Sequence, residues 1–145
     1  MVPKAQIPCS TYDKVFLPAQ KTRRLVQQDF DRVFIQSNLL SHKSSAVENG
    51  VHVILTPCAM SSAPTIEDCL PDSDKREDDD TDKHTGAVDS YVNDVMTIPA
   101  SLAGIPAISV PFGKSEGLPV GLQLLGQYGY DRFLLEIANK LSKST

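Results

Sequence analysis

Three polar residues occupy positions at which this sequence could carry nucleophilic or charge-stabilising chemistry: Ser101, Ser109 and Asp94. A serine nucleophile needs a neighbouring base to take its proton, and that base needs a third group to orient it. Neither serine has a Lys or His at local spacing, so both are predicted to be structural hydroxyls that bond to the backbone. The pattern therefore assigns no residue a catalytic role.

Asp94 differs from the serines because it falls in a segment, between Val88 and Ile98, whose apolar residues repeat at helical spacing. A carboxylate in the C-terminal half of a helix opposes the helix dipole, and it loses hydration if the helix is buried. Such a residue is either exposed to solvent or paired with a cation. The pattern alone favours a plain surface carboxylate at Asp94, with a cation-binding residue as the alternative.

The remaining reactive residues have the spacing of neither a metal site nor a phosphate-binding loop. The histidines have no i,i+4 partner and join no Cys/His cluster: His42, His52 and His84. The glycines form neither G-x-G-x-x-G nor G-x-x-x-x-G-K, and three of them are interpreted as turn and packing residues: Gly113, Gly117 and Gly121. The cysteines are odd in number and form no C-x-x-C pair, which indicates free thiols in a reducing compartment: Cys9, Cys58 and Cys69.

The elements that must position these residues alternate between helix and strand. Pro99 should end or kink the helix that carries Asp94, and the strand that contains Pro111 should leave its ladder near that residue. With only three strands visible, the order predicts an α/β fold with an incomplete sheet. The expected elements are a helix over 18–36, a buried strand over 51–56, a helix over 88–98, buried strands over 107–112 and 120–125 around a turn at 114–119, and a helix from Asp131.

Composition separates one segment from the rest of the chain. Residues 67–86 are acidic and almost without apolar side chains, which predicts a flexible surface insertion. The net charge of −4 and the isoelectric point near 5.2 argue against a nucleic-acid-binding surface. No apolar run approaches the ~18 residues of a membrane span, and residues 1–10 show no targeting signal.

Three segments, in this order, resemble the C-terminal end of the amidase signature family, and in particular its amidotransferase A subunits. They are AQKTRRLVQQDFDRVF at 19–34, VHVILTPCAMSSAPTI at 51–66, and PASLAGIPAISVPFG followed by GLPVGLQLLG at 99–113 and 117–126. The resemblance implies the C-terminal portion of an α/β/α sandwich with a mixed central sheet, incomplete in this chain. It assigns residues 12–145 to that part of the amidase domain and leaves 1–11 unassigned.

Family members cleave amides with a Lys–cis-Ser–Ser triad that lies in a Gly/Ser-rich signature, and these 145 residues contain no such signature. The resemblance therefore implies no catalytic residue here and no activity for the chain alone. Asp94 stands at the acidic position of the family's Tyr-x-Asn-Asp motif, where the carboxylate holds the α-ammonium of the substrate glutamine. The chain departs from the family at His52, which replaces the acidic residue usual in that strand motif.

The resemblance also implies a role and partners. The parent protein would hydrolyse glutamine and supply ammonia for converting Glu-tRNA(Gln) to Gln-tRNA(Gln), together with the B and C subunits of the amidotransferase. The tRNA would be reached through the complex, and the partner protein, rather than this chain, would use ATP and magnesium. The acidic insertion favours the mitochondrial version and hence the matrix, with the cytoplasm as the other location.

Two other functions remain open on the sequence alone. The first alternative is a non-catalytic binding remnant that docks on a partner protein. The second is a segment of a general amidase that acts on another small amide. Asp94 bears on the second of these, because a carboxylate that holds an ammonium group makes little sense for a lipid or aryl amide.

Overall fold

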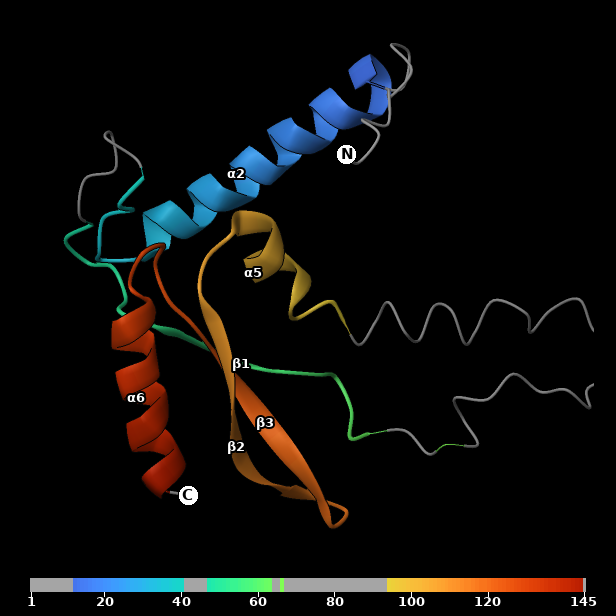
Figure 1. Cartoon of the computed structure of the whole chain (residues 1–145), viewed down its shortest axis with the longest axis vertical. Helices are drawn as coiled ribbons and strands as arrows, with labels where there is room; N and C mark the ends of the chain where they lie inside the picture. Colours follow the sequence, from blue (N-terminus) through green and yellow to red (C-terminus); the bar gives the residue numbers. More distant parts are fainter. Residues whose placement is uncertain (1–11, 41–46, 64–65, 67–93, 145) are drawn as a thin grey trace, which may run out of the picture.

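The computed structural model describes residues 12–40, 47–63, 66 and 94–144 of the chain (Figure 1). The predicted insertion at 67–86 lies outside these residues, as does most of the predicted helix over 88–98. The elements are a π-helical turn η1 (Tyr12–Phe16), helix α2 (Leu17–Val33), strand β1 (Ile54–Pro57), helix α5 (Ile98–Ala103), strands β2 (Ala107–Ser115) and β3 (Leu118–Leu125), and helix α6 (Asp131–Ser144).

The three strands form one antiparallel sheet in the order β1-β3-β2, so β3 is the central strand. Strands β2 and β3 are joined by a two-residue turn, Glu116-Gly117, in which both residues have positive φ (53° and 82°). That geometry twists in the same sense as the strands, and glycine adopts it without strain. The observed turn is therefore shorter than the predicted turn over 114–119, because both strands extend into that range.

Strand β2 does not leave the ladder at Pro111, contrary to the sequence-based expectation. The pairing shifts register between Pro111 and Gly113 and then continues to Ser115. A proline is tolerated here because β2 is an edge strand, and the bulge leaves Phe112 rather than Pro111 without a partner in the ladder. β1 likewise begins at Ile54 rather than Val51, three residues later than expected.

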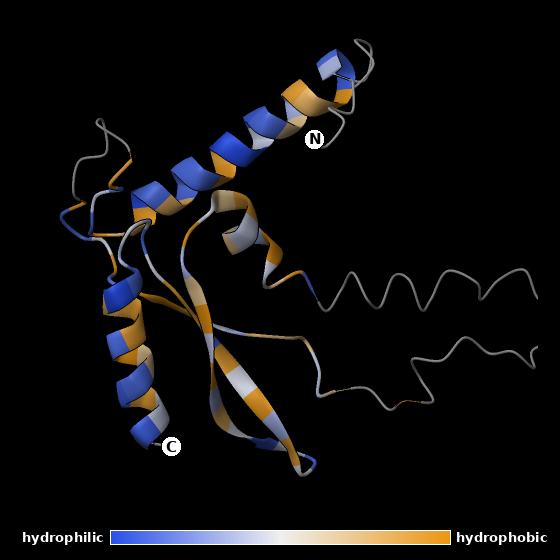
Figure 2. Ribbon diagram, viewed as in Figure 1, coloured by the Kyte–Doolittle hydropathy of each residue, from blue (hydrophilic) through white to orange (hydrophobic). Residues whose placement is uncertain are grey.

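The sheet lies between two helical layers (Figures 1 and 2). Helix α6 covers one face and contributes Leu134 and Ala138 to a cluster with Val110 and Leu124. Helix α5 and the end of α2 cover part of the other face, through a cluster of Phe34, Ala100, Ala103, Ile105 and Leu125. The prediction of an α/β fold is confirmed. The prediction that all three strands are buried is wrong, because β1 and β2 form the edges and most of β2 is exposed.

Helix α2 ends at Val33 rather than at the expected Gln36. Phe34 is extended (φ −78°, ψ 138°) and makes a parallel bridge to Val51. This bridge uses two backbone hydrogen bonds, from Ile35 N to Val51 O (3.0 Å) and from Val51 N to Val33 O (2.8 Å). Backbone pairing therefore competes with the helix for the groups at its C-terminus.

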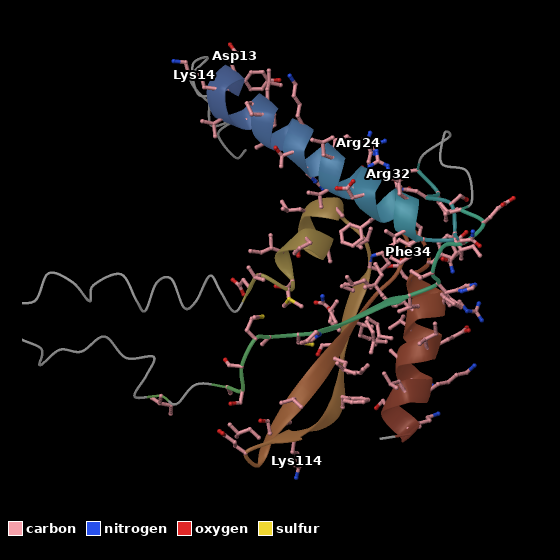
Figure 3. All side chains as sticks on the ribbon, turned by 180° about the vertical axis from the view of Figure 1, so that it is seen from behind. Asp13, Lys14, Arg24, Arg32, Phe34 and Lys114 are labelled. Carbon is pink, nitrogen blue, oxygen red and sulfur yellow. The ribbon has the colours of Figure 1, made fainter. Side chains whose placement is uncertain are left out.

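Much of α2 projects away from the rest of the molecule. Figure 3 places Asp13 and Lys14 at the far end and Phe34 at the end that meets the other elements. Phe34 is fully buried, but Leu25 is 60% exposed, and no residue within α2 itself is buried. The sequence periodicity identified the helix correctly but not how much of its face is covered.

Side chains of α2 also satisfy the free carbonyl groups at the C-terminus of α5. Arg23 Nε donates to Leu102 O (2.8 Å), and Gln27 Nε2 donates to Ala103 O (3.3 Å). The last carbonyls of a helix have no partner within it, and a cation beside them is favourable. These contacts help to hold α5, and the turn that precedes it, in a fixed place against α2.

Leu124 provides a direct test of the packing between the sheet and α6. It is fully buried, so Leu124→Ala is expected to lower the free energy of unfolding by about 2–5 kcal/mol through lost burial and a residual cavity. Leu135→Ala is the matched control, because Leu135 lies on α6 but is 57% exposed, and a change within about 0.5 kcal/mol is expected. Urea denaturation followed by circular dichroism measures both. Equal losses would mean that Leu124 is not part of the core.

Candidate functional site

Three polar side chains lie in register across one face of the sheet: Thr56, Gln123 and Ser109, called here the polar row. Gln123 on β3 is paired with Thr56 on β1 and with Ser109 on β2, and paired residues of adjacent strands point to the same face. This face is opposite the one that α6 covers. Gln123 is only 5% exposed, whereas Ser109 is exposed at the edge strand.

The amide of Gln123 connects the polar row to the turn before α5. Its Nε2 donates to Met96 O (3.0 Å) and, at greater length, to Thr56 Oγ1 (3.4 Å). Met96 belongs to the short turn Asp94–Thr97, which leads directly into the first residue of α5. The sheet and this turn are therefore linked by a side chain as well as by apolar packing.

Asp94 stands at the start of that turn with its side chain exposed. Its backbone carbonyl accepts two hydrogen bonds from Thr97, one from N and one from Oγ1, each 3.0 Å. Among the residues that the structure describes, no lysine or arginine forms an ion pair with the carboxylate. The turn fixes the backbone of Asp94 while leaving its charge accessible.

Ser101 is a structural hydroxyl, as predicted. It lies on α5, and its Oγ donates to Thr97 O (3.3 Å), one helical turn earlier. Ser109 was expected to bond to the backbone, and this was wrong. Its Oγ lies 2.9 Å from Cys58 Sγ, and either atom can be the donor.

Gly121 makes the Cys58–Ser109 contact possible. A Cβ at Gly121 would lie 2.7 Å from Ser109 Oγ and 3.3 Å from Cys58 Sγ. Gly121 was interpreted from the sequence as a turn or packing residue, and the crowding by these two side chains confirms a packing role. Cys58 is a partly buried free thiol, and the other two cysteines lie outside the described residues.

The described residues contain no arrangement for metal binding or for spanning a membrane. No group of three His, Cys, Asp or Glu side chains gathers there, and none of the helices in these ranges has both the length and the hydropathy needed to cross a bilayer. His52 is exposed, with its ring tilted against that of Phe133 at a centroid distance of 6.4 Å. The other two histidines fall outside the described ranges.

This arrangement can bind and orient a ligand, but it lacks the parts that activate a nucleophile. Ser101 donates to a backbone carbonyl and Ser109 contacts a thiol, so neither is engaged by a base. Asp94 supplies an exposed negative charge, which can pair with a ligand that carries an ammonium group.

Gln123 was not singled out from the sequence, although the sequence does contain a signal for it. It is the one amide in the apolar run Val120–Leu125. A buried amide is costly unless it is hydrogen-bonded, so a lone glutamine in a central strand indicates a required partner. The partner itself, Met96 O, is a backbone atom 27 residues away and has no signature in the sequence.

A family model described as Amidase matches residues 2–135, which is most of the chain. The chain belongs to the amidase family. The mitochondrial A subunit of glutamyl-tRNA(Gln) amidotransferase from Tuber melanosporum is 42% identical over 129 residues, which cover 87% of this chain and 24% of that protein. The protein of the same name from Emericella nidulans is 38% identical over 145 residues, covering 90% of this chain and 27% of that protein.

Solved structures agree with the family assignment. The A subunit of glutamyl-tRNA(Gln) amidotransferase from Thermotoga maritima matches with a TM-score of 0.65 and 32% identity, over 94% of this chain and 24% of that one. The 6-aminohexanoate cyclic dimer hydrolase matches with a TM-score of 0.61 at 22% identity, which shows a shared fold. The chain spans about a quarter of the length of the curated relatives named above. The predicted family and the partial amidase fold are confirmed.

The crowding at Gly121 leads to a stability prediction. Gly121→Ala is expected to cost roughly 1–3 kcal/mol of unfolding free energy, because the new methyl group displaces the Ser109 hydroxyl and breaks its contact with Cys58. In a Ser109→Ala background the same change should cost at least about 0.5 kcal/mol less, because the clashing oxygen is gone. Denaturation of the four proteins in this cycle measures the coupling. Purely additive effects would show that the methyl group and the hydroxyl do not collide.

Proposed function

We propose that this chain is the C-terminal segment of a glutamine-hydrolysing amidase subunit that supplies ammonia for converting Glu-tRNA(Gln) to Gln-tRNA(Gln). The single observation that carries the proposal is the placement of Asp94, an exposed carboxylate on a turn that is tied to the polar face of the sheet. An exposed carboxylate can pair with an α-ammonium group, and the names of the relatives support glutamine as the source of that group.

In this proposal the chain binds the substrate, and the rest of the complete protein supplies the catalytic residues. Asp94 holds the α-ammonium of glutamine by a charge-assisted hydrogen bond and so presents the side-chain amide to a nucleophilic serine supplied from outside these residues. Attack on the amide carbon releases ammonia and leaves an acyl-enzyme, which water then hydrolyses to glutamate. The chain alone is expected to be inactive, because Asp94 provides neither a nucleophile nor oxyanion-stabilising donors.

The same proposal names partners and a location. The B and C subunits of an amidotransferase complete the complex, and tRNA is reached through them. The B component uses ATP and magnesium to activate the glutamate on tRNA, and this chain holds no cofactor. The mitochondrial matrix is the proposed compartment, which the names of the fungal relatives support.

The test places this chain in a complete protein of the family. The aligned segment of the Tuber melanosporum protein is replaced by these residues, and ammonia release from glutamine is measured with Asp94 intact and with Asp94→Asn. We expect activity in the first protein, and in the second a KM for glutamine raised about tenfold or more, because a hydrogen bond to a charged group is lost. The value of kcat should change much less.

Two controls make this test specific. Asp29→Asn makes the same chemical change at an exposed carboxylate that pairs with Arg32 on α2, and it should leave the KM within about twofold. Glutaramic acid, which is glutamine without its α-amino group, should be hydrolysed equally poorly with and without Asp94. A KM that is unchanged in Asp94→Asn, or raised equally for both substrates, would sink the proposed role and favour a general small-amide amidase.

A further inference from the structure

We propose that Gln123 is a positioning residue that holds the substrate-binding turn Asp94–Thr97 against the sheet. This inference rests on the proposed function of Asp94, and it assigns the orientation of that carboxylate to a side chain on another element. Gln123 contacts the turn through Met96 O at 3.0 Å, and its side chain is buried, with 5% exposure.

The geometry of the turn explains how one contact orients Asp94. The turn is closed by two hydrogen bonds from Thr97 to Asp94 O, so its backbone moves as a unit. Met96 lies between those two residues, and its carbonyl is the point at which Gln123 holds the unit. A displacement of Met96 is therefore passed directly to the backbone from which the Asp94 carboxylate extends.

The surrounding contacts leave this task to Gln123. Apolar packing holds α5 by Ala100 and Ala103, which come after the turn, and Arg23 and Gln27 hold the carbonyls at the far end of α5. Ser101 bonds to Thr97 O, but both residues belong to α5 and its first turn, so this bond does not connect them to the sheet. Among the contacts of the described residues, the Gln123–Met96 bond is the polar link from the sheet to the turn.

The cost of burying an amide supports a specific role. At this buried position of the central strand, an apolar side chain would be covered without desolvating a polar group. The Gln123 amide is retained in a place where it must find partners, and its better partner is the turn rather than Thr56. The amide thus specifies a position that apolar contacts alone would leave variable.

The test compares amide hydrogen exchange in the full chain and in Gln123→Met, which keeps the length of the side chain but cannot donate. The amide of Thr97 reports on the turn, because it is bonded to Asp94 O. We expect it to exchange about tenfold faster in Gln123→Met, while amides of α6 change less than about twofold. Unchanged Thr97 exchange, or an equal acceleration in α6, would overturn the proposal, the latter because Gln123 would then stabilise the whole fold.

Two further variants keep the result interpretable. Thr56→Val removes the longer 3.4 Å contact of the same amide and leaves the bond to Met96, so Thr97 exchange should rise less than about twofold. Gln123→Asn serves if the methionine variant does not fold, because it stays polar but falls one methylene short of Met96, and it should accelerate Thr97 exchange as well. An effect of Thr56→Val as large as that of Gln123→Met would contradict the assignment to Met96.

The exchange experiment contains no glutamine, so its outcome does not depend on what Asp94 binds. Failure of the proposed function would appear as an unchanged KM in Asp94→Asn, whereas failure of this inference would appear at Thr97. In the complete protein that carries this segment, Gln123→Met should raise the KM for glutamine, and it should add less than about twofold in the Asp94→Asn background. Full additivity there would show that Gln123 acts independently of Asp94.

Discussion

The pairing of β3 with a strand on each side is the constraint on which the rest of the structure depends. Successive residues of β3 point to opposite faces, so Leu122 and Leu124 meet α6 while Gln123 and Leu125 meet the other layer. A slip of one residue would turn Gln123 towards α6 and Leu124 towards the turn before α5. Because both faces are in use, this register is specified twice, once by apolar packing and once by the polar row.

Buried side-chain amides add directional hydrogen bonds to the packing of the apolar clusters. Gln127, just after β3, is fully buried and donates from Nε2 to Asp31 Oδ1 (3.1 Å) and Gln36 O (3.3 Å), while Asn38 Nδ2 donates to the same Asp31 oxygen (2.9 Å). This network fixes the end of α2 beside the loop that leads to α6. Gln123 makes the corresponding connection for the turn before α5. Apolar contacts bring these elements together, and directional hydrogen bonds determine where each one stops.

The sequence predicted helices and strands wherever one periodicity dominated, and it was less accurate wherever two forces competed. The helix after Asp131 and the strand over 120–125 come close to their observed bounds, because each has a clear apolar pattern. Pro99 was expected to end a helix, yet it lies in the first turn of α5, where its missing N–H is harmless. Pro111 was expected to end a strand, but a bulge on an edge strand accommodates it. In both cases the effect of the proline depended on an element boundary that local sequence does not define.

In the candidate site, too, local sequence predicted some features and long-range contacts determined the others. Asp94 was identified because a carboxylate in an apolar pattern demands an explanation, but nothing local to Asp94 reveals Gln123, 29 positions later in the chain. The serines attracted attention because of their type, yet their partners turned out to be a thiol and a backbone carbonyl. Residue type thus indicates which group carries charge or a proton, whereas long-range pairing decides whether that group is held in place.

The division of labour proposed for the complete protein follows from what this layer of the fold can supply. A sheet with helices on both faces gives a rigid base, and a hydrogen-bonded turn at its surface gives an anchored charge. Both are suited to holding a substrate, since binding requires a fixed position and little chemistry. Bond cleavage also requires a nucleophile with its base and donors aimed at an oxyanion, and here Ser101 and Ser109 are engaged elsewhere. In the proposed function, this segment holds the ammonium end of the substrate, and a nucleophile outside the segment attacks the side-chain amide.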